Sequence, residues 1–391
     1  MTSEWHEVPL RELVGYISKG IAPSYAEEAS ETTIRVLNQK CNRNFRISYG
    51  DSRLHDTLKK KVPPERYVKP DDILINSTGA GTAGRIAQIE DVPFATTIDG
   101  HMILIRSNGK VTQKFLGYAL KAHQWEVLQL DEGSTGQTEL NRDRLLDEIM
   151  INYPVSFDEQ NAIVGTLESI DRKLIVNEQL NDNLADLLQT VYQERFGDTS
   201  LVANQGILSD ICSYSRDKVA VSELNVSTYF STENMLSGKA GSTEATSLPT
   251  TPQTTACHKG DTLISNIRPY FKKIVYCEDK CGCSTDVLCF TPSQPKYSAY
   301  LFSTLYADKF FAFMVAGSKG TKMPRGDKQQ IMTYPVVLPS EAALDEFNAI
   351  ALPLIEQIYS NRAENKRLSV LRDTLLPKLM SGEINVSAVQ L

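Results

Sequence analysis

A glycine-rich run is the first stretch of this sequence whose residue types and spacing could do chemistry. Gly79, Gly81 and Gly84 match the GxGxxG pattern of dinucleotide-binding turns, with Asp99 at a suitable distance downstream. Such a turn must be followed by a helix whose N-terminus holds the pyrophosphate. Residues 85–89 instead have the pattern of a strand. We therefore expect a turn that offers backbone amides and hydroxyls to a phosphate.

Four cysteines in the second half of the chain form the next candidate group. Cys277, Cys281 and Cys283 lie close in sequence, and Cys289 follows them. A structural zinc site needs four ligands, commonly as paired CxxC motifs or with histidine. The CxxxC and CxC spacings, without a histidine close by, favour small buried residues at a hairpin over zinc. We expect no metal.

Motifs for catalysis are otherwise lacking. The run Asn152, Tyr153, Pro154 and Val155 faintly resembles the Asn/Asp-Pro-Pro-Tyr/Phe motif of amino-methyltransferases, but the second proline and the terminal aromatic residue are missing. The five histidines are scattered, without a Ser-His-Asp arrangement. Nuclease-type clusters of acidic residues with lysine are also absent from the sequence. The sequence predicts neither catalytic residues nor a cofactor.

Positive charge is concentrated in one part of an acidic chain. The net charge is −7, but residues 35–69 contain ten basic and three acidic residues. A locally positive face on an acidic protein is compatible with binding a polyanion.

Cysteine number and hydropathy predict the compartment. Seven cysteines are an odd number, which favours reduced thiols over a disulfide framework. No apolar run approaches the roughly 20 residues of a membrane span, and the first residues lack the pattern of a signal peptide. We expect a cytoplasmic protein without a membrane segment.

Two regions of the chain have the mixed strand and helix patterns of α/β domains. The first has predicted strands at residues 33–37, 72–76, 85–89 and 101–105, with a helix at 114–129. The second has predicted strands at 262–266, 274–277 and 287–291, with a helix at 297–313.

The whole chain repeats itself once, with a period of about 190 residues. The matching segments are 10–13 with 208–211, 71–76 with 260–265, 133–137 with 317–321, 151–155 with 332–336, and 158–163 with 345–350. Their common order and spacing indicate two duplicated domains.

A long amphipathic segment follows each mixed region. In residues 157–196, apolar residues from Ile163 to Val191 alternate in the four-three pattern of a coiled-coil seam, and residues 342–376 have a similar stripe. Pro353 should start or kink the second helix. The helices can pair with each other across a pseudo-twofold axis. Polar residues on the seams are expected to fix the register of this pair: Asn177, Asn181, Asn361 and Asn365.

This arrangement resembles the specificity (S) subunit of a Type I DNA restriction-modification enzyme. The resemblance is carried by the paired Gly-Ser-x-Gly and Asp-Glu-x-Asn-Ala-Ile segments, by residues 229–235 and 260–271, and by the tail at 376–384. It implies an α+β fold with two similar mixed α/β target recognition domains, separated by two long antiparallel coiled-coil helices in a pseudo-twofold repeat. The predicted parts are the recognition domains 1–156 and 199–340, the spacer helix 157–198, and the second spacer helix with its tail, 341–391.

The resemblance also implies a function without catalysis. In such a subunit, each recognition domain reads one half of a bipartite asymmetric site in double-stranded DNA. The helices set the unread spacer and dock two modification (methyltransferase) subunits, through which restriction subunits join. Residues 77–82 replace the Ile-Arg-Pro-Tyr run of the second unit, a difference expected if the two domains read different bases.

DNA-facing residues are predicted from their chemistry. Arg and Lys neutralise phosphates, and Arg, Asn and Gln read base edges from loops on a rigid scaffold. In the first domain they are Lys40, Arg43, Asn44, Arg46, Lys59, Lys60, Lys61, Ser77, Thr78, Thr82, Arg85 and Gln137. In the second they are Arg268, Tyr270, Lys272, Lys273, Lys319, Lys322 and Arg325. A solvated surface charge is the alternative for each, and Arg268, beside a proline and two aromatic residues, is the best candidate for a base contact.

Two other functions remain open. A methyltransferase or nuclease with its own recognition domain would need a cofactor loop and a catalytic centre. A coiled-coil scaffold joining two protein-binding domains would not bind duplex DNA in a salt-dependent way.

Overall fold

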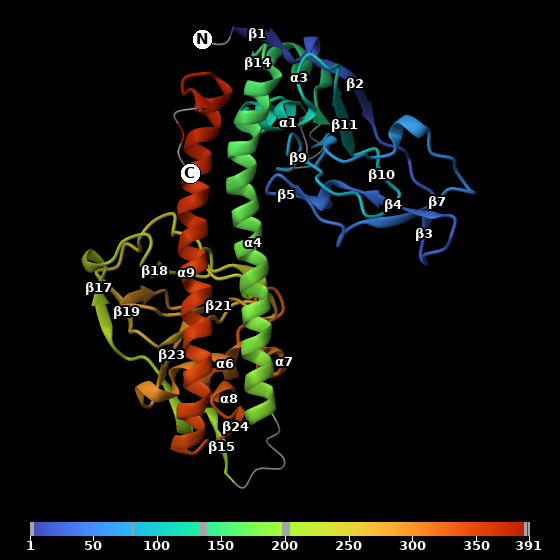
Figure 1. Cartoon of the computed structure of the whole chain (residues 1–391). Coiled ribbons are helices and arrows are strands. Elements are labelled where there is room, and N and C mark those ends of the chain that lie inside the picture. Colours follow the sequence, from blue (N-terminus) through green and yellow to red (C-terminus); the bar gives the residue numbers. More distant parts are fainter. Residues whose placement is uncertain (1–3, 80, 133–138, 198–203, 387–388, 390–391) are drawn as a thin grey trace. The chain divides into compact units, whose positions relative to one another are not determined.

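The computed structural model describes residues 4–79, 81–132, 139–197, 204–386 and 389. The chain divides into two compact units, of which unit 1 comprises residues 1–175 and 365–391 and unit 2 comprises residues 176–364 (Figure 1). Both units mix strands with helices, and each contains part of two long helices. The predicted α+β fold with two similar domains and two long helices is confirmed.

Unit 1 is built on two four-stranded sheets, ordered β2-β11-β8-β9 and β10-β4-β7-β3, and on shorter pairs of strands. Its strands are β1 (Trp5–Pro9), β2 (Val14–Lys19), β3 (Tyr25–Ala26), β4 (Thr33–Leu37), β5 (Asn42–Arg43), β6 (Arg46–Ile47), β7 (Arg53–Asp56), β8 (Ile73–Asn76), β9 (Ile86–Gln88), β10 (Thr96–Ile98), β11 (Met102–Ser107), β12 (Asp131–Glu132), β13 (Glu139–Leu140) and β14 (Met150–Pro154). Its shorter helices are α1 (Gln113–Ala122), α2 (Gln124–Val127) and α3 (Arg142–Glu148).

Unit 2 also has two four-stranded sheets, ordered β16-β23-β20-β21 and β17-β19-β22-β18. Its strands are β15 (Gln205–Ile207), β16 (Cys212–Tyr214), β17 (Lys218–Ala220), β18 (Tyr229–Phe230), β19 (Gln253–Cys257), β20 (Thr262–Ser265), β21 (Ile274–Tyr276), β22 (Cys281–Cys283), β23 (Val287–Pro292) and β24 (Pro335–Val337). Its shorter helices are α5 (Leu208–Ile211), α6 (Ser298–Tyr306), α7 (Asp308–Ala316) and α8 (Lys328–Ile331).

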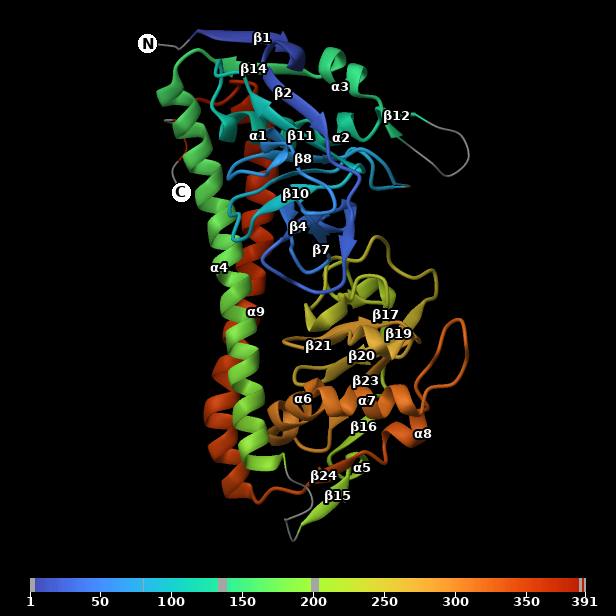
Figure 2. The same ribbon diagram turned by 90° about the vertical axis from the view of Figure 1, so that its right-hand side faces the viewer.

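The internal repeat appears in the strand order. The sheet β2-β11-β8-β9 of unit 1 has the same chain order as β16-β23-β20-β21 of unit 2, and β1 pairs with β14 as β15 pairs with β24. Figure 2 shows β2, β11 and β8 next to one another in unit 1, and β20 and β23 in unit 2. The other large sheets differ in strand order. The duplicated part is therefore one four-stranded sheet together with the two-stranded pair whose second strand precedes each long helix.

Two long helices, α4 (Phe157–Phe196) and α9 (Glu341–Met380), lie alongside each other in both views (Figures 1 and 2). They are antiparallel in both units. In unit 2, Asn361 Nδ2 donates to Asn181 Oδ1 (2.9 Å) and Asn177 Nδ2 donates to Glu364 Oε2 (2.7 Å). In unit 1, Asn365 Nδ2 donates to the Leu174 carbonyl oxygen (3.1 Å). All four seam asparagines therefore bond across the helix pair.

Some helix boundaries differ from the sequence pattern. Pro353 does not start the second long helix, because α9 begins at Glu341 and continues through it. The predicted helix 114–129 is divided at His123 into α1 and α2, and the predicted helix 297–313 is divided at Ala307, whose backbone is extended. Among the helices of the described ranges, none has the length and apolar character of a membrane span.

A buried carboxylate joins the first domain to both long helices in unit 1. Asp171 of α4 accepts hydrogen bonds from Lys121 Nζ (2.9 Å) and the Tyr118 hydroxyl (2.9 Å) of α1, and from Arg372 Nη1 (3.1 Å) of α9. We call these four residues the aspartate cluster. Burial alone would raise the pKa of Asp171, but the charge of Lys121 and hydrogen bonds from Lys121, Arg372 and Tyr118 outweigh it and lower that pKa.

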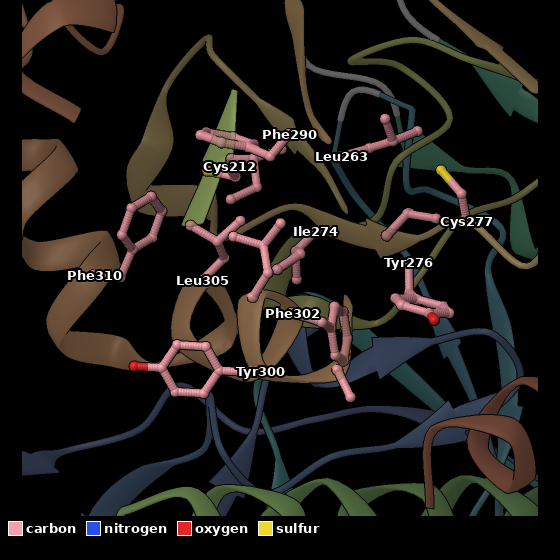
Figure 3. Close-up of a cluster of buried hydrophobic side chains, with 14 of the residues drawn as sticks. Cys212, Leu263, Ile274, Tyr276, Cys277, Phe290, Tyr300, Phe302, Leu305 and Phe310 are labelled. Carbon is pink, nitrogen blue, oxygen red and sulfur yellow. The ribbon is translucent and has the colours of Figure 1, made fainter. Parts of the chain in front are cut away.

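In unit 2, aromatic side chains join the second domain to both long helices. Tyr192 and Phe196 of α4, Tyr300 of α6 and Phe347 of α9 pack with ring centroids 4.9–6.5 Å apart. We call them the aromatic cluster. The Tyr300 hydroxyl satisfies its buried hydrogen bond at the Val337 carbonyl (2.6 Å). Figure 3 shows the adjoining core, in which side chains from β23 and α6 face one another.

Candidate nucleic-acid interface

In unit 1, the glycine-rich run forms the turn between β8 and β9. Gly79, Gly81 and Gly84 have φ values of 114°, 69° and 83°, which side chains with a Cβ rarely adopt. The Thr82 N–H closes the turn on the Gly79 carbonyl (2.9 Å). A strand follows instead of a helix, so the turn lacks the helix N-terminus that a pyrophosphate site requires.

The predicted polar residues of this turn differ in accessibility. Ser77 is fully buried, and its hydroxyl has no hydrogen-bond partner among the described residues. Thr78 Oγ1 lies 2.8 Å from His101 Nδ1, and Arg85 Nη2 donates to the Gly81 carbonyl (3.1 Å). Thr82 is half-buried. The side chains of Thr78 and Arg85 thus stabilise the turn itself, and a DNA contact through Ser77 would require rearrangement.

The β5–β6 hairpin lies beside this turn. Asn42 Nδ2 donates to the Arg85 carbonyl (2.8 Å), and Asn76 Nδ2 donates to the Gln39 carbonyl (3.2 Å). The hairpin turn has positive φ at Asn44 and at the residue after it, as tight hairpins require. The structure therefore places four predicted residues near the glycine turn. Lys40, Arg43 and Asn44 are exposed, and Arg46 is half-buried.

The lysine run after β7 makes contacts of its own. Lys59, Lys60 and Lys61 are exposed, and Lys60 Nζ donates to the Ala22 carbonyl (2.8 Å). Within the described ranges, no hydrogen bond or ion pair links these lysines to the glycine turn. Gln137, also predicted to face DNA, lies outside the described residues.

In unit 2, the turn between β20 and β21 occupies the equivalent place. The Arg268 N–H donates to the Pro324 carbonyl (2.8 Å), and a β-bridge joins Ile267 to Arg325. A matching bridge joins Thr78 to Glu139 in unit 1. The bridge in unit 2 brings five exposed predicted residues onto two adjoining segments: Arg268, Tyr270, Lys319, Lys322 and Arg325.

Carboxylates partly neutralise this basic surface. Asp308 accepts from Lys239 Nζ (2.7 Å) and Lys272 Nζ (3.0 Å), and these hydrogen bonds lower the pKa of Asp308. Two further ion pairs are those of Lys319 with Asp327 (2.6 Å) and of Arg325 with Asp286 (3.0 Å).

Two predicted cations of unit 2, Arg268 and Lys322, have no carboxylate partner among the described residues, and a third, Lys273, is partly buried. Within the described part of the chain, the side chains of Arg268 and Lys322 form no hydrogen bond or ion pair. Lys273 Nζ donates to the Thr232 carbonyl (2.6 Å), and burial lowers the pKa of Lys273. Arg268 and Lys322 are therefore the most available cations of the predicted set in this unit.

Sequence reasoning missed Phe271 in this turn. Its ring lies 4.8 Å from that of Tyr270, and both side chains are exposed. The signal was present in the Pro-Tyr-Phe run, in which Tyr270 alone was selected.

The cysteine group of unit 2 lies in the core. Cys277 and Cys281 have sulfurs 3.5 Å apart, and the Cys289 thiol donates to Asp261 Oδ2 (3.2 Å). Cys257, which the sequence did not single out, lies opposite Cys281 in the β19–β22 register. Across the described residues, no group of three or more Cys, His, Asp or Glu side chains could hold a metal ion.

Comparison with known proteins finds similar sequences and a similar fold. Residues 2–185 match the family model of the Type I restriction modification DNA specificity domain. The Type I restriction enzyme MjaIX specificity subunit of Methanocaldococcus jannaschii is 34% identical over 73 residues, which are 19% of this chain and 17% of that relative's length. The crystal structure of the S subunit of a Type I restriction-modification system from M. genitalium has the same fold, with a TM-score of 0.62 at 18% identity over 97% of this chain and 96% of that one.

The class that these findings define is the DNA specificity domain of Type I restriction-modification systems. Residues 2–185 of the chain belong to the family of the Type I restriction modification DNA specificity domain.

Proposed function

We propose that the chain is the non-catalytic DNA-recognition subunit of a Type I restriction-modification complex. Residues 1–156 and 199–340 each read one half of a bipartite, asymmetric site in duplex DNA. The helical segments 157–198 and 341–391 set the unread spacer and dock two modification subunits, and restriction subunits join through the complex. The chain itself needs no cofactor.

The observation that carries this proposal is the pair of equivalent turns with unlike residues. The β8–β9 turn of unit 1 and the β20–β21 turn of unit 2 follow the same strand of the repeated sheet and form the same bridge to a second segment. One turn is glycine-rich, and the other contains arginine, proline and two aromatic residues. Two copies of one scaffold with different turns are suited to reading two different base sequences.

The seam contacts support the spacer role. Two long helices that bond through asparagines on their seam have a fixed register, so their length defines a distance. Inserting one heptad into α4 and a matching heptad into α9 adds about 10 Å of helix. The unread gap should then grow by about three base pairs, at 3.4 Å per pair along a strand. Both half-sites should stay the same.

Methylome sequencing of cells with and without the chain tests the whole proposal. A methylated bipartite motif that disappears with the chain supports recognition. The heptad variant should give the same two half-sites with a longer gap, and a heptad placed in α4 alone serves as the control for a damaged helix pair. A change in half-site identity would contradict the spacer role.

Salt-dependent binding separates the proposal from its rivals. Duplex binding with the modification subunits present should weaken steeply as salt rises, because phosphate contacts release counterions. A protein-binding scaffold would show no such dependence. A methyltransferase would bind S-adenosylmethionine as an isolated chain.

A further inference from the structure

Within the described ranges, the residues with positive φ that are not glycine are Asn44, Phe45, Asp71, Lys239, Arg268 and Lys272. This left-handed conformation is strained for a residue with a Cβ, and least so for asparagine. Such strain persists where the surroundings enforce it, or where function needs the side chain.

Five of the six have an evident reason. Asn44 belongs to the residue types that tolerate the conformation. The others have side chains engaged inside their own unit: the Phe45 ring packs against the core of unit 1, Asp71 pairs with a lysine, and Lys239 and Lys272 share a carboxylate.

Arg268 has no such reason. Its φ is 49° and its ψ is 63°, and the following Pro269 disfavours helical conformations at the residue before it. Its side chain is exposed and has no polar partner among the described residues. Gly79 in the equivalent turn of unit 1 has a φ of 114° without this strain. A glycine at position 268 would relieve the backbone strain. The turn therefore has an arginine at a position where its backbone conformation favours glycine.

Two aromatic rings accompany this guanidinium. Tyr270 is 50% exposed and Phe271 is 38% exposed. The turn is closed by the Phe271 N–H on the Arg268 carbonyl (2.9 Å) and by the Lys272 N–H on the Pro269 carbonyl (2.9 Å). A rigid turn that leaves two large rings in water is typical of a binding surface.

The chemistry of these groups fits a particular pair of bases. A guanidinium fork donates two hydrogen bonds to O6 and N7 of guanine in the major groove, and apolar rings contact the methyl group of thymine. We propose that Arg268 reads a guanine in the second half-site and that Tyr270 and Phe271 contact the methyl group of an adjacent thymine. This inference rests on the proposed function and names part of its target.

Glycine substitution separates function from structure. Arg268→Gly should raise the thermal midpoint by about 2 °C, because it relieves a strained backbone. The same variant should weaken specific duplex binding about tenfold to a hundredfold, since a bidentate base contact is lost. Arg216→Gly is the matched control, because Arg216 is also exposed in unit 2 and lacks positive φ. It should leave affinity unchanged and should not raise the midpoint.

Base analogues then identify the contacted bases. Binding is measured for the full chain with its modification subunits, on duplexes whose site has been mapped by methylome sequencing. Replacing one guanine of the second half-site by 7-deazaguanine should weaken the wild type about tenfold and leave Arg268→Ala unaffected. Replacing the adjacent thymine by uracil should weaken the wild type about threefold and leave the Tyr270→Ala, Phe271→Ala double variant unaffected.

The outcomes distinguish this inference from the proposed function. Two results would contradict the assignment of base reading to this turn: the wild type binds the mapped duplex but no analogue in that half-site weakens binding, or Arg268→Gly keeps full affinity. In either case the proposed DNA recognition still stands. If the wild type does not bind the duplex at all, the proposed function fails with it.

Discussion

The repeated Asp-Glu-x-Asn-Ala-Ile motif lies in the first turns of both long helices, but its third residue differs between the units. It is Gln160 in unit 1 and Phe347 in unit 2, and both are fully buried. Gln160 Nε2 donates to the Pro154 carbonyl (2.9 Å), and its Oε1 accepts from the Thr112 N–H (2.8 Å). Phe347 lies in the aromatic cluster instead. One backbone position thus joins a domain to its helix through hydrogen bonds in one unit and through rings in the other.

The same contrast continues along the helices. Unit 1 adds the aspartate cluster, whereas unit 2 adds more aromatic and apolar burial. The duplicated architecture requires a firm connection between sheet and helix, but it does not require a particular interaction. The two units should therefore respond to different perturbations, unit 1 to changes of charge and unit 2 to changes of packing.

The largest effect is expected from replacing the buried ring. Phe347→Gln removes the packing of a fully buried ring and buries an amide without the partners that Gln160 has. The free energy of unfolding should fall by about 4 kcal/mol or more. Equilibrium urea unfolding measures it, and Phe347→Leu is the control with a smaller loss. Equal losses for both variants would contradict the view that unit 2 depends on apolar packing.

Removal of the carboxylate at the centre of the aspartate cluster comes next. Asp171→Ala leaves Lys121 and Arg372, whose side chains are 11% and 17% exposed, without their shared partner. Unfolding free energy should fall by about 3 kcal/mol. Arg144→Ala, which breaks an exposed pair with Glu148, is the control and should cost less than about 0.5 kcal/mol. Similar costs for the two variants would show that the cluster is only a surface network.

The seam asparagines should give a smaller and non-additive effect. Asn361→Leu leaves the buried Asn181 oxygen without its donor and should cost about 1–2 kcal/mol. The double variant Asn181→Leu, Asn361→Leu should recover most of this loss, because both polar groups are gone. A double-mutant cycle in urea measures the coupling. Additive losses would mean that the two asparagines act separately and do not fix register as a pair.

The smallest expected effect is a pH dependence confined to unit 1. The folded pKa of Asp171 is lowered, so its carboxylate stabilises the fold above the unfolded pKa of about 3.9, and this contribution is lost as the pH falls through the folded value. The Asp171→Asn variant lacks this pH-dependent contribution. The stability difference between wild type and Asp171→Asn should shrink as the pH falls from about 5 to about 3. A difference that stays constant over that range would exclude the linkage.

Local patterns predicted most of the fold because strands and helices here follow their own periodicity. Residues 33–37 form β4 as predicted, and the strands at 72–76 and 262–266 appear as β8 and β20 with small shifts at their ends. The break at His123 was not predictable, because the contacts beside it come from residues remote in the chain. The Gln124 side chain, directly after the break, bonds the backbone of Gly84 and Ile86. The break at Ala307 is likewise not predicted by the helical pattern.

The candidate interface was only partly predictable for the same reason. Arg268 and Tyr270 could be selected from the sequence by residue type. The positive φ of Arg268 and its backbone hydrogen bond to Pro324, which is remote in the chain, could not be predicted in this way. The pairing of Lys272 with Asp308 likewise joins residues of different elements. Cys257 was missed because strand pairing, not spacing, brings it to the other thiols. The DNA contacts proposed for the candidate residues stay predictions.

The division of the chain has a consequence for the order in which the units can fold during synthesis. Unit 2 is one continuous segment, so its residues are all available once the ribosome has made residue 364. The core of unit 1 includes Leu376, Leu379 and Met380, which pack with Ile163 and Leu167 of the first long helix. The first domain to be translated is therefore the last whose core can close. Until then it exposes an apolar helix face, a period in which nascent chains of this protein should be most dependent on chaperones.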